Sequence, residues 1–376
     1  MGLWLFHDLI SKPELYEDDL EGDGRRFYTD GCNVGKYLKE LVAAGGIDGM
    51  MTVGEMSSTT LENCIGYTSE KNHELTMCFN FHHLKVDYKN GQKWELMPPD
   101  HGALKRLFQT WQEGMQEHGG WNALFWCNHD QPRAVSRFGS DTTYWRESAE
   151  MLATAIHCMR GTPYIYQGEE LGLFEVADIP WDRLEDPTAF HTAQATMDKG
   201  RDGCRVPLPW TASDEPALAD FSRPAPADDG TGENHVPLCA AGQFGTGASF
   251  GFSPAVRADG VTPAADPHLP QPLWFKDYAV DVEQADPDSM YTLYHAALAI
   301  RQESLTATRD TTAEQVGMGD DVVAYTRAAV GGRVFTSITN FGNAPIALPD
   351  GSVVLASGPL TPEGQLPTDT SAWVIK

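Results

Sequence analysis

The sequence lacks the features that define several large classes of protein. No apolar run reaches the about 18 residues that a membrane-spanning helix needs, and the first residues show neither the basic segment nor the cleavage site of a secretory signal. Neither a Gly-rich dinucleotide fingerprint nor a P-loop motif occurs, which disfavours a nucleotide enzyme. The seven cysteines form no CxxC pair. This predicts free thiols in a reducing cytoplasm, with no metal and no cofactor.

Basic residues are scarce as well. The 376 residues include 27 Lys and Arg against 53 Asp and Glu, a net charge of −26. A field of that sign repels nucleic acid and anionic membranes, so neither is expected as a partner. The length and a 41% hydrophobic content suffice for one large domain and a smaller one, and nothing in the pattern indicates an oligomeric state.

The chain divides into three zones of different texture. In residues 1–175, helical spacing at 34–44, 103–115 and 149–159 alternates with apolar runs at 50–53, 78–81, 122–127 and 161–166, which predicts a parallel α/β array. Residues 176–285 are rich in Pro, Gly, Ala and Asp, and 213–270 have the character of a loop. A helix at 291–302 and short strands at 322–326, 334–340, 346–348, 353–356 and 372–375 follow, which predicts a small antiparallel β-sandwich.

Carboxylates follow two of the predicted strands. Glu55 comes after the run at 50–53, and Asp130 follows Asn128 and His129 at the end of the run at 122–127. Either carboxylate alone is typical of a solvated loop or a turn. Together at the carboxyl ends of parallel strands they suit glycoside hydrolysis, which needs two carboxyl groups about the scissile bond. Glu55, among apolar residues, suits the acid role, and Asp130 lies in a polar set suited to sugar hydroxyls.

Four segments resemble signature regions of the α-amylase family of glycoside hydrolases, in its oligo-1,6-glucosidase branch. They are residues 52–56 (TVGEM), 128–133 (NHDQPR), 161–170 (GTPYIYQGEE) and 201–210 (RDGCRVPLPW). The resemblance implies a (β/α)8 barrel followed by a β-sandwich, and hydrolysis of α-glucosides with retention. We expect residues 1–305 to form an incomplete barrel, from the end of the fourth strand through the eighth helix. Residues 306–376 would form the C-terminal sandwich.

The same resemblance implies roles for individual residues. Glu55 is expected to be the general acid/base. Asp130 is expected to be the third carboxylate, which supports the transition state. Substrate-binding residues carried over by position are His129, Arg201, Asp202 and Arg205, with Arg133 expected to orient carboxylates through a bidentate pair.

The chain departs from the family at the nucleophile. Counting back from residues 8–12 (DLISK) places Leu5 where the family has its nucleophilic Asp, and Leu3 where it has an Arg. Asp8 is displaced by three residues and lacks the Arg. A leucine cannot attack an anomeric carbon. We therefore expect an N-terminally truncated chain that is inactive alone, with a non-catalytic carbohydrate-binding remnant or a pseudogene product as the alternatives.

The leaving group is less clearly indicated. Residues 51–64 and 79–94 resemble trehalose-6-phosphate hydrolases, whereas residues 198–210 and 251–253 resemble α-glucosidases of high-GC Gram-positive bacteria. Lys85, Lys89 and Lys93 are candidate phosphate-binding residues beside the acid/base strand, although solvated lysines on a hairpin would give the same pattern. An α-glucoside or a phospho-disaccharide is the expected substrate.

Overall fold

The computed structural model describes most of the chain after residue 29. The described residues are 30–31, 33–47, 49–57, 59–93, 95–177, 179–187, 200–213, 217–218, 244–246, 250–253, 260, 267–305, 313–315 and 317–376. Leu3, Leu5 and Asp8 lie outside them, so the nucleophile position has no structural account. Most of the predicted loop at 213–270 lies outside them too.

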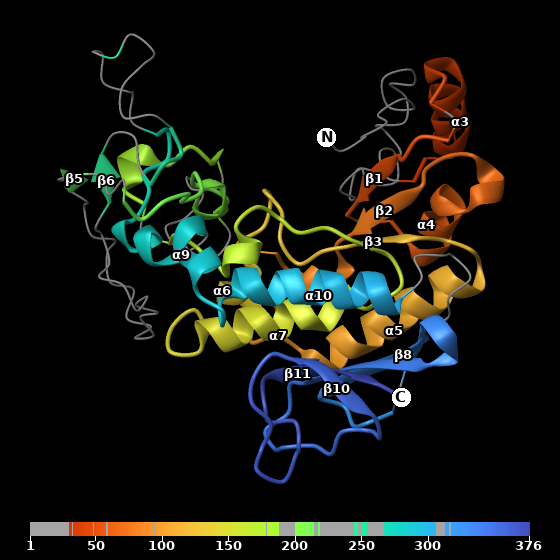
Figure 1. The fold of residues 1–376 in the computed structure, drawn as a ribbon. Helices are drawn as coiled ribbons and strands as arrows, with labels where there is room; N and C mark the ends of the chain where they lie inside the picture. The colour runs from red at the N-terminus through yellow and green to blue at the C-terminus, as the bar shows by residue number, and fades with distance from the viewer. Residues whose placement is uncertain are drawn as a thin grey trace.

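A parallel sheet forms the first part of the structure (Figure 1). Its strands β1 (Val53–Met56), β2 (Met77–Asn80), β3 (Asn122–Leu124) and β4 (Thr162–Pro163) lie side by side in chain order. All three pairings are parallel. Helices connect the strands, as in successive βα units. They are α4 (Leu61–Thr68), α5 (His101–Glu117), α6 (Ala134–Phe138) and α7 (Trp145–His157), and α3 (Val34–Gly45) precedes β1.

The strand register defines one face of this sheet. Glu55 pairs with Phe79, and Phe79 pairs with Ala123. Residues opposite one another in a parallel sheet project to the same side, so these three share a face. Aromatic side chains cover part of it, with the Phe79 and Tyr164 ring centroids 4.6 Å apart. Glu55 is therefore placed on the aromatic face of the sheet.

Helix α7 lies between the parallel sheet and the antiparallel sheet at the C-terminal end of the chain. Met151, Leu152, Ala155 and Ile156 belong to a core that also contains Phe125 and Trp126 after β3 and Phe335 and Trp373 of the C-terminal sheet. Helix α10 (Met290–Ser304) packs beside α7 (Figure 1). Buried indole and hydroxyl groups donate to α7 carbonyls, which satisfies polar groups at this junction. Trp373 Nε1 donates to Thr154 O at 3.0 Å, and Ser371 Oγ to Met151 O at 3.1 Å.

The C-terminal region is one antiparallel sheet with a second layer of loop. Its strand order is β10-β11-β9-β8-β7. The bounds are β7 (Ala313–Gln315), β8 (Val322–Ala328), β9 (Val334–Asn340), β10 (Ser352–Ala356) and β11 (Thr370–Ile375). Residues 346–348 and 360–366 cover the face away from α7, where Ile346 and Leu348 pack on the core of Ile338 and Val374. The predicted run at 346–348 forms an isolated bridge to Leu366 within this layer.

The remaining elements are short. Between β4 and α10 lie η5 (Glu169–Leu171), η6 (Trp181–Arg183), η8 (Gly203–Arg205), β5 (Ala217–Leu218), β6 (Gly245–Thr246), η9 (Leu273–Tyr278) and α9 (Val280–Ala285). Further one-turn helices are η2 (Glu70–Asn72), η3 (His82–Lys85), η4 (Lys89–Gly91) and η10 (Val330–Gly332). Within the part of the chain that the structure describes, no helix is long and apolar enough to span a bilayer.

A buried ion pair joins the turn after η3 to helix α6. Arg137 Nε and Nη2 donate to the Asp87 carboxylate at 2.7 and 2.9 Å, and both side chains are at most 4% exposed. Arg137 also donates to Gln131 Oε1 at 2.9 Å and to Leu84 O. Because Gln131 directly follows Asp130, this pair fixes the loop that carries the candidate site.

Candidate active site

The loop after β3 presents Asp130. Strand β3 ends at Leu124, three residues before the predicted boundary, and 125–127 continue as a buried segment. The backbone N–H of Asp130 donates to Asn128 Oδ1 at 2.9 Å. Such a side-chain bond to the backbone two residues on stabilises a tight turn. The turn leaves the Asp130 carboxylate one-third exposed at the carboxyl end of the sheet.

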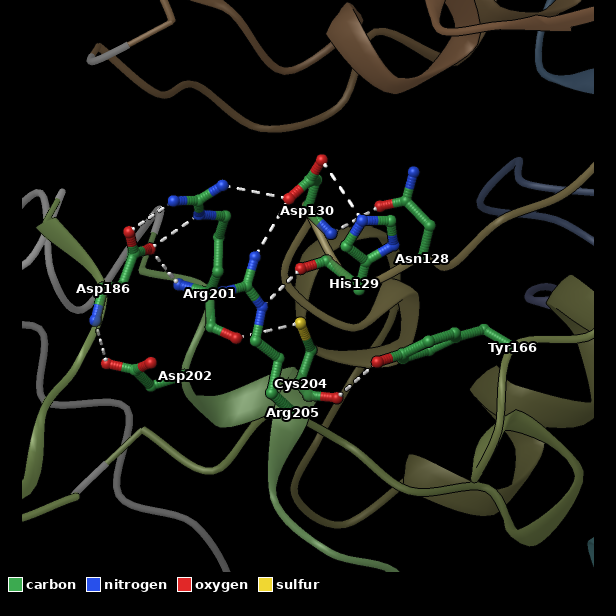
Figure 2. A network of polar contacts seen from close by, with 9 residues as sticks. All are labelled: Asn128, His129, Asp130, Tyr166, Asp186, Arg201, Asp202, Cys204 and Arg205. Carbon is green, nitrogen blue, oxygen red and sulfur yellow. Dashed lines mark hydrogen bonds and ion pairs between the residues drawn. The ribbon is translucent and has the colours of Figure 1, made fainter. Parts of the chain in front are cut away.

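Two arginines converge on one oxygen of that carboxylate (Figure 2). Arg201 Nη1 and Arg205 Nη2 lie 3.0 and 2.9 Å from Asp130 Oδ1. On the other oxygen, Oδ2, His129 Nε2 lies at 3.6 Å. Arg205 Nε also donates to His129 O at 2.7 Å, so Arg205 binds both residues of the turn. The sequence-predicted residues His129, Asp130, Arg201 and Arg205 therefore form one cluster.

Arg201 also binds Asp186, a residue that the sequence analysis did not identify. The buried Asp186 carboxylate accepts from Arg201 Nε at 2.9 Å and from Nη2 at 2.7 Å. These hydrogen bonds, and further those to Asp130, raise the pKa of Arg201 above its ordinary value. Asp186 lies in the Pro- and Gly-rich zone, where no periodicity marks it out. The bidentate hydrogen bonds of Asp186 fix the Arg201 guanidinium, which faces Asp130.

Asp202 supports this arrangement. Its buried carboxylate accepts from the backbone N–H groups of Glu185 and Asp186 at 2.8 and 2.9 Å. The Asp202 side chain is therefore turned toward the backbone of a neighbouring loop, and its predicted contact with substrate stays a prediction. Figure 2 shows the resulting chain of contacts from Asp202 through Asp186 and Arg201 to Asp130.

Among the described residues Arg133 bonds to backbone carbonyls, and its predicted bidentate pair with a carboxylate is not seen there. Arg133 is 2% exposed, and its guanidinium donates to Gln167 O at 3.1 Å and to Cys204 O at 3.3 Å. It lies over the Tyr166 ring, whose hydroxyl also donates to Cys204 O, at 3.1 Å. A buried backbone carbonyl needs a hydrogen-bond donor. Arg133 and Tyr166 supply donors to the carbonyls of Gln167 and Cys204 beneath the site.

Glu55 lies in strand β1, not after it. The strand runs from Val53 to Met56, so the predicted boundary is three residues early, and Met50 and Met51 are exposed ahead of it. Glu55 is half-buried on the face that it shares with Phe79. Among the described residues its carboxylate has no hydrogen bond or ion pair. The network of Figure 2 does not include it, and its closeness to Asp130 stays a prediction.

The three lysines occupy different places. Lys85 Nζ donates to Ser57 O at 2.6 Å, in the loop that follows β1, and Lys89 is exposed on η4. Lys93 is an exposed residue whose ammonium lies within electrostatic reach of the cluster. Partial burial of that ammonium, followed by the charge of Arg201, lowers the pKa of Lys93, and Asp130 acts in the opposite sense. Lys93 thus adds positive charge beside Asp130.

The assembled cluster sets three cationic side chains, Arg201, Arg205 and Lys93, against the carboxylates of Asp130, Asp186 and Asp202. Arg201 and Arg205 surround a partly exposed carboxylate, and Lys93 lies nearby. Such a set can donate hydrogen bonds to several oxygens of a polyol or phosphate while Asp130 accepts from hydroxyl groups. Within the described ranges no group of three or more His, Cys, Asp or Glu side chains could hold a metal ion.

Comparisons with known proteins agree with this geometry. The family model described as "Alpha amylase, catalytic domain" matches residues 6–227, more than half of the chain. A trehalose-6-phosphate hydrolase of Bacillus subtilis is 50% identical over 223 residues, 55% of this chain and 40% of that protein. An oligo-1,6-glucosidase of Bacillus cereus is 41% identical over 225 residues, 54% of this chain and 40% of that protein.

The structural likeness extends further along the chain. The trehalose-6-phosphate hydrolase of Bacillus licheniformis superposes with a TM-score of 0.74 and 33% identity, over 95% of this chain and 61% of that one. The predicted fold class, a partial (β/α)8 barrel followed by a separate antiparallel β-region, is confirmed. In the described residues the predicted β-sandwich is one five-stranded sheet covered by a layer of loop. The chain spans about two-fifths of the length of the curated relatives that it matches. On these matches and this site, the chain belongs to the α-amylase family of glycoside hydrolases.

Proposed function

We propose that this chain binds the glucosyl unit of an α-glucoside, as a retaining α-glucosidase of the trehalose-6-phosphate hydrolase type does. The observation that carries the proposal is the Asp130 carboxylate, held at the carboxyl end of the sheet between Arg201 and Arg205. In this role Asp130 and His129 bind hydroxyl groups of the ring. In a chain that also carries the nucleophile, Glu55, on the aromatic face of the sheet, would protonate the leaving oxygen.

Phosphate on the leaving sugar is the second part of the proposal. Lys93 lies within the electrostatic reach of Arg201, and Lys85 is tied to the loop after Glu55. Arg201 and Arg205 are already paired with Asp130 and Asp186, so Lys93 would be the main cation facing a phosphate dianion between these loops. Both relatives named trehalose-6-phosphate hydrolase support this choice over an unphosphorylated disaccharide.

A carbohydrate-binding role without turnover is the alternative, and one residue favours it. Leu5 stands where the family has its nucleophile, and no glycosyl-enzyme can form on a leucine. We therefore expect the 376-residue chain to bind substrate without releasing glucose. Hydrolysis of maltose, isomaltose and trehalose 6-phosphate should all stay at the background rate.

The test is calorimetric titration of the chain with trehalose 6-phosphate and with trehalose. We expect tighter binding of the phosphorylated sugar. Lys93→Ala should weaken that binding about 10-fold, since a charged hydrogen bond contributes about 1.5–3 kcal/mol, and leave trehalose unaffected. Lys71→Ala, an exposed lysine on η2, is the matched control. Equal affinity for both sugars would contradict the phosphate assignment, and no binding of either would contradict the proposed function.

A cytoplasmic location belongs to the same proposal. The five described cysteines, Cys64, Cys78, Cys127, Cys158 and Cys204, are all free thiols. Free thiols persist in a reducing compartment. A phosphorylated sugar is also a typical intracellular metabolite, because its charge hinders passage through a bilayer.

A further inference from the structure

The segment that follows β4 carries a buried carboxylate next to the candidate site. Glu175 lies between Phe174 and Val176, which are anchored in a hydrophobic core with Leu171 and Leu173. Its own backbone N–H donates to Ser136 Oγ at 2.9 Å. The residue is 8% exposed, so its carboxylate is directed into the protein and cannot contact a sugar.

This carboxylate contacts the two segments that build the Asp130 cluster. Glu175 Oε2 accepts from the backbone N–H of Arg133 at 2.8 Å, in the loop that carries His129 and Asp130. On its other side the carboxylate lies against the turn at Gly203 and Cys204, between Arg201 and Arg205, and the Cys204 N–H lowers its pKa. One side chain therefore contacts both segments of the arginine–aspartate pair.

Close packing at Gly203 shows how tightly the second segment is held. A Cβ built at position 203 would collide with the Glu175 carboxylate, 2.8 Å from Cδ, and would lie 2.5 Å from Val176 O. Only glycine lets the turn of η8 approach the carboxylate so closely. The charge of Arg133, whose guanidinium bonds to Cys204 O, reinforces the same junction.

We infer that Glu175 is a positioning residue: its ionised carboxylate clamps the loop of Asp130 to the turn of Arg201 and Arg205, and so sets the affinity of the glucosyl pocket. The inference rests on the proposed function for its ligand, although the clamp itself is a property of the free protein. The ionised form accepts from the Arg133 N–H and is favoured by the Cys204 N–H. A protonated carboxyl turns one oxygen into a donor that faces an N–H, so one of these two contacts is lost.

The Glu175 carboxyl titrates in a pH range in which sugar binding can be measured. Burial raises the pKa of Glu175 to about 7, and the negative charge of Asp202 acts in the same direction. The N–H groups and the charge of Arg133 oppose the shift. The Cys204 thiol and the Tyr166 hydroxyl are further titratable groups at this junction. If only the ionised form is competent, apparent affinity scales with the ionised fraction. Binding should then be about 10-fold weaker at pH 6 than at pH 8.

The experiment is calorimetric titration with glucose, an uncharged probe, between pH 5.5 and 8.5. In the wild type we expect affinity to rise with pH through about 7. Glu175→Gln should weaken binding at pH 8 about 10-fold or more and remove this dependence, because the amide keeps the size of the side chain but not its charge. Glu150→Gln on α7 is the matched control, since the pKa of Glu150 is also raised to about 7 but it lies outside the junction.

Hydrogen exchange separates the clamp from the ligand. The amides of Arg133 and Cys204 should exchange faster in Glu175→Gln than in the wild type, with or without sugar. Gly203→Ala, which displaces the turn and keeps the carboxylate, should give the same exchange and affinity changes in a folded protein. Unchanged exchange, or unchanged glucose affinity and pH profile in Glu175→Gln, would overturn the inference. If the wild type binds no sugar, the proposed function is refuted. The hydrogen-exchange rates of Arg133 and Cys204 alone would then decide whether Glu175 acts as the clamp.

Discussion

Arg137→Ala is expected to lower the free energy of unfolding by about 3–5 kcal/mol, the range for breaking a buried ion pair. The change leaves the Asp87 carboxylate at 3% exposure without its bidentate partner. It also removes the donor to Gln131, beside Asp130. Urea unfolding followed by circular dichroism measures the loss.

Two further variants make this expectation specific. Arg146→Ala breaks an ion pair with Asp286 in which both side chains are more than one-third exposed, so it should change stability far less. The double variant Arg137→Met, Asp87→Leu removes both buried charges and should regain most of the loss. An Arg137→Ala protein as stable as Arg146→Ala would contradict a structural role for the buried pair.

Asp130→Asn is expected to weaken glucose binding by about 10- to 100-fold, because a neutral amide loses charge-assisted hydrogen bonds. In the described structure Arg205 would lose its carboxylate partner, whereas Arg201 would keep Asp186. We expect the substitution to weaken both the fixed geometry of the pocket and the binding of sugar hydroxyl groups. Calorimetry at pH 8, where the Glu175 carboxylate is mostly ionised, measures the change in glucose affinity.

The unfolding midpoint of Asp130→Asn should stay close to that of the wild type, since Asp130 is one-third exposed. Asp277→Asn, an exposed aspartate on η9, provides a control of the same chemistry away from the cluster. Undiminished glucose affinity in Asp130→Asn would place the sugar elsewhere.

Periodicity located most elements correctly, but it placed their ends less well. The helix predicted at 149–159 is α7, which begins four residues earlier, at Trp145. Polar residues follow Trp145 in the first turn, so a search for apolar residues at helical spacing does not reach it. The run at 122–127 continues apolar beyond Leu124, yet it leaves the strand there, since the chain turns into the buried segment ahead of Asp130. Boundaries of this kind depend on neighbouring strands, which one sequence does not reveal.

Motifs identified residues that face the cluster, but they missed those that hold it. His129, Asp130, Arg201 and Arg205 were predicted and lie together. Asp186 and Glu175 act through backbone groups and long-range pairs, and such contacts leave no periodic trace in the sequence. Arg133 and Asp202 carry motif positions, yet both are buried among carbonyl and N–H groups, which only the packing of three loops could show.

The relation between Glu55 and Asp130 is the most direct test of the proposed active site. A crystal structure of the chain soaked with glucose would measure it. The proposal predicts one sugar ring in contact with both carboxylates and with Arg205 or His129, the carboxyl groups lying within about 10 Å of each other. Glucose bound away from Asp130, or the two carboxylates farther apart with no shared cavity, would contradict it.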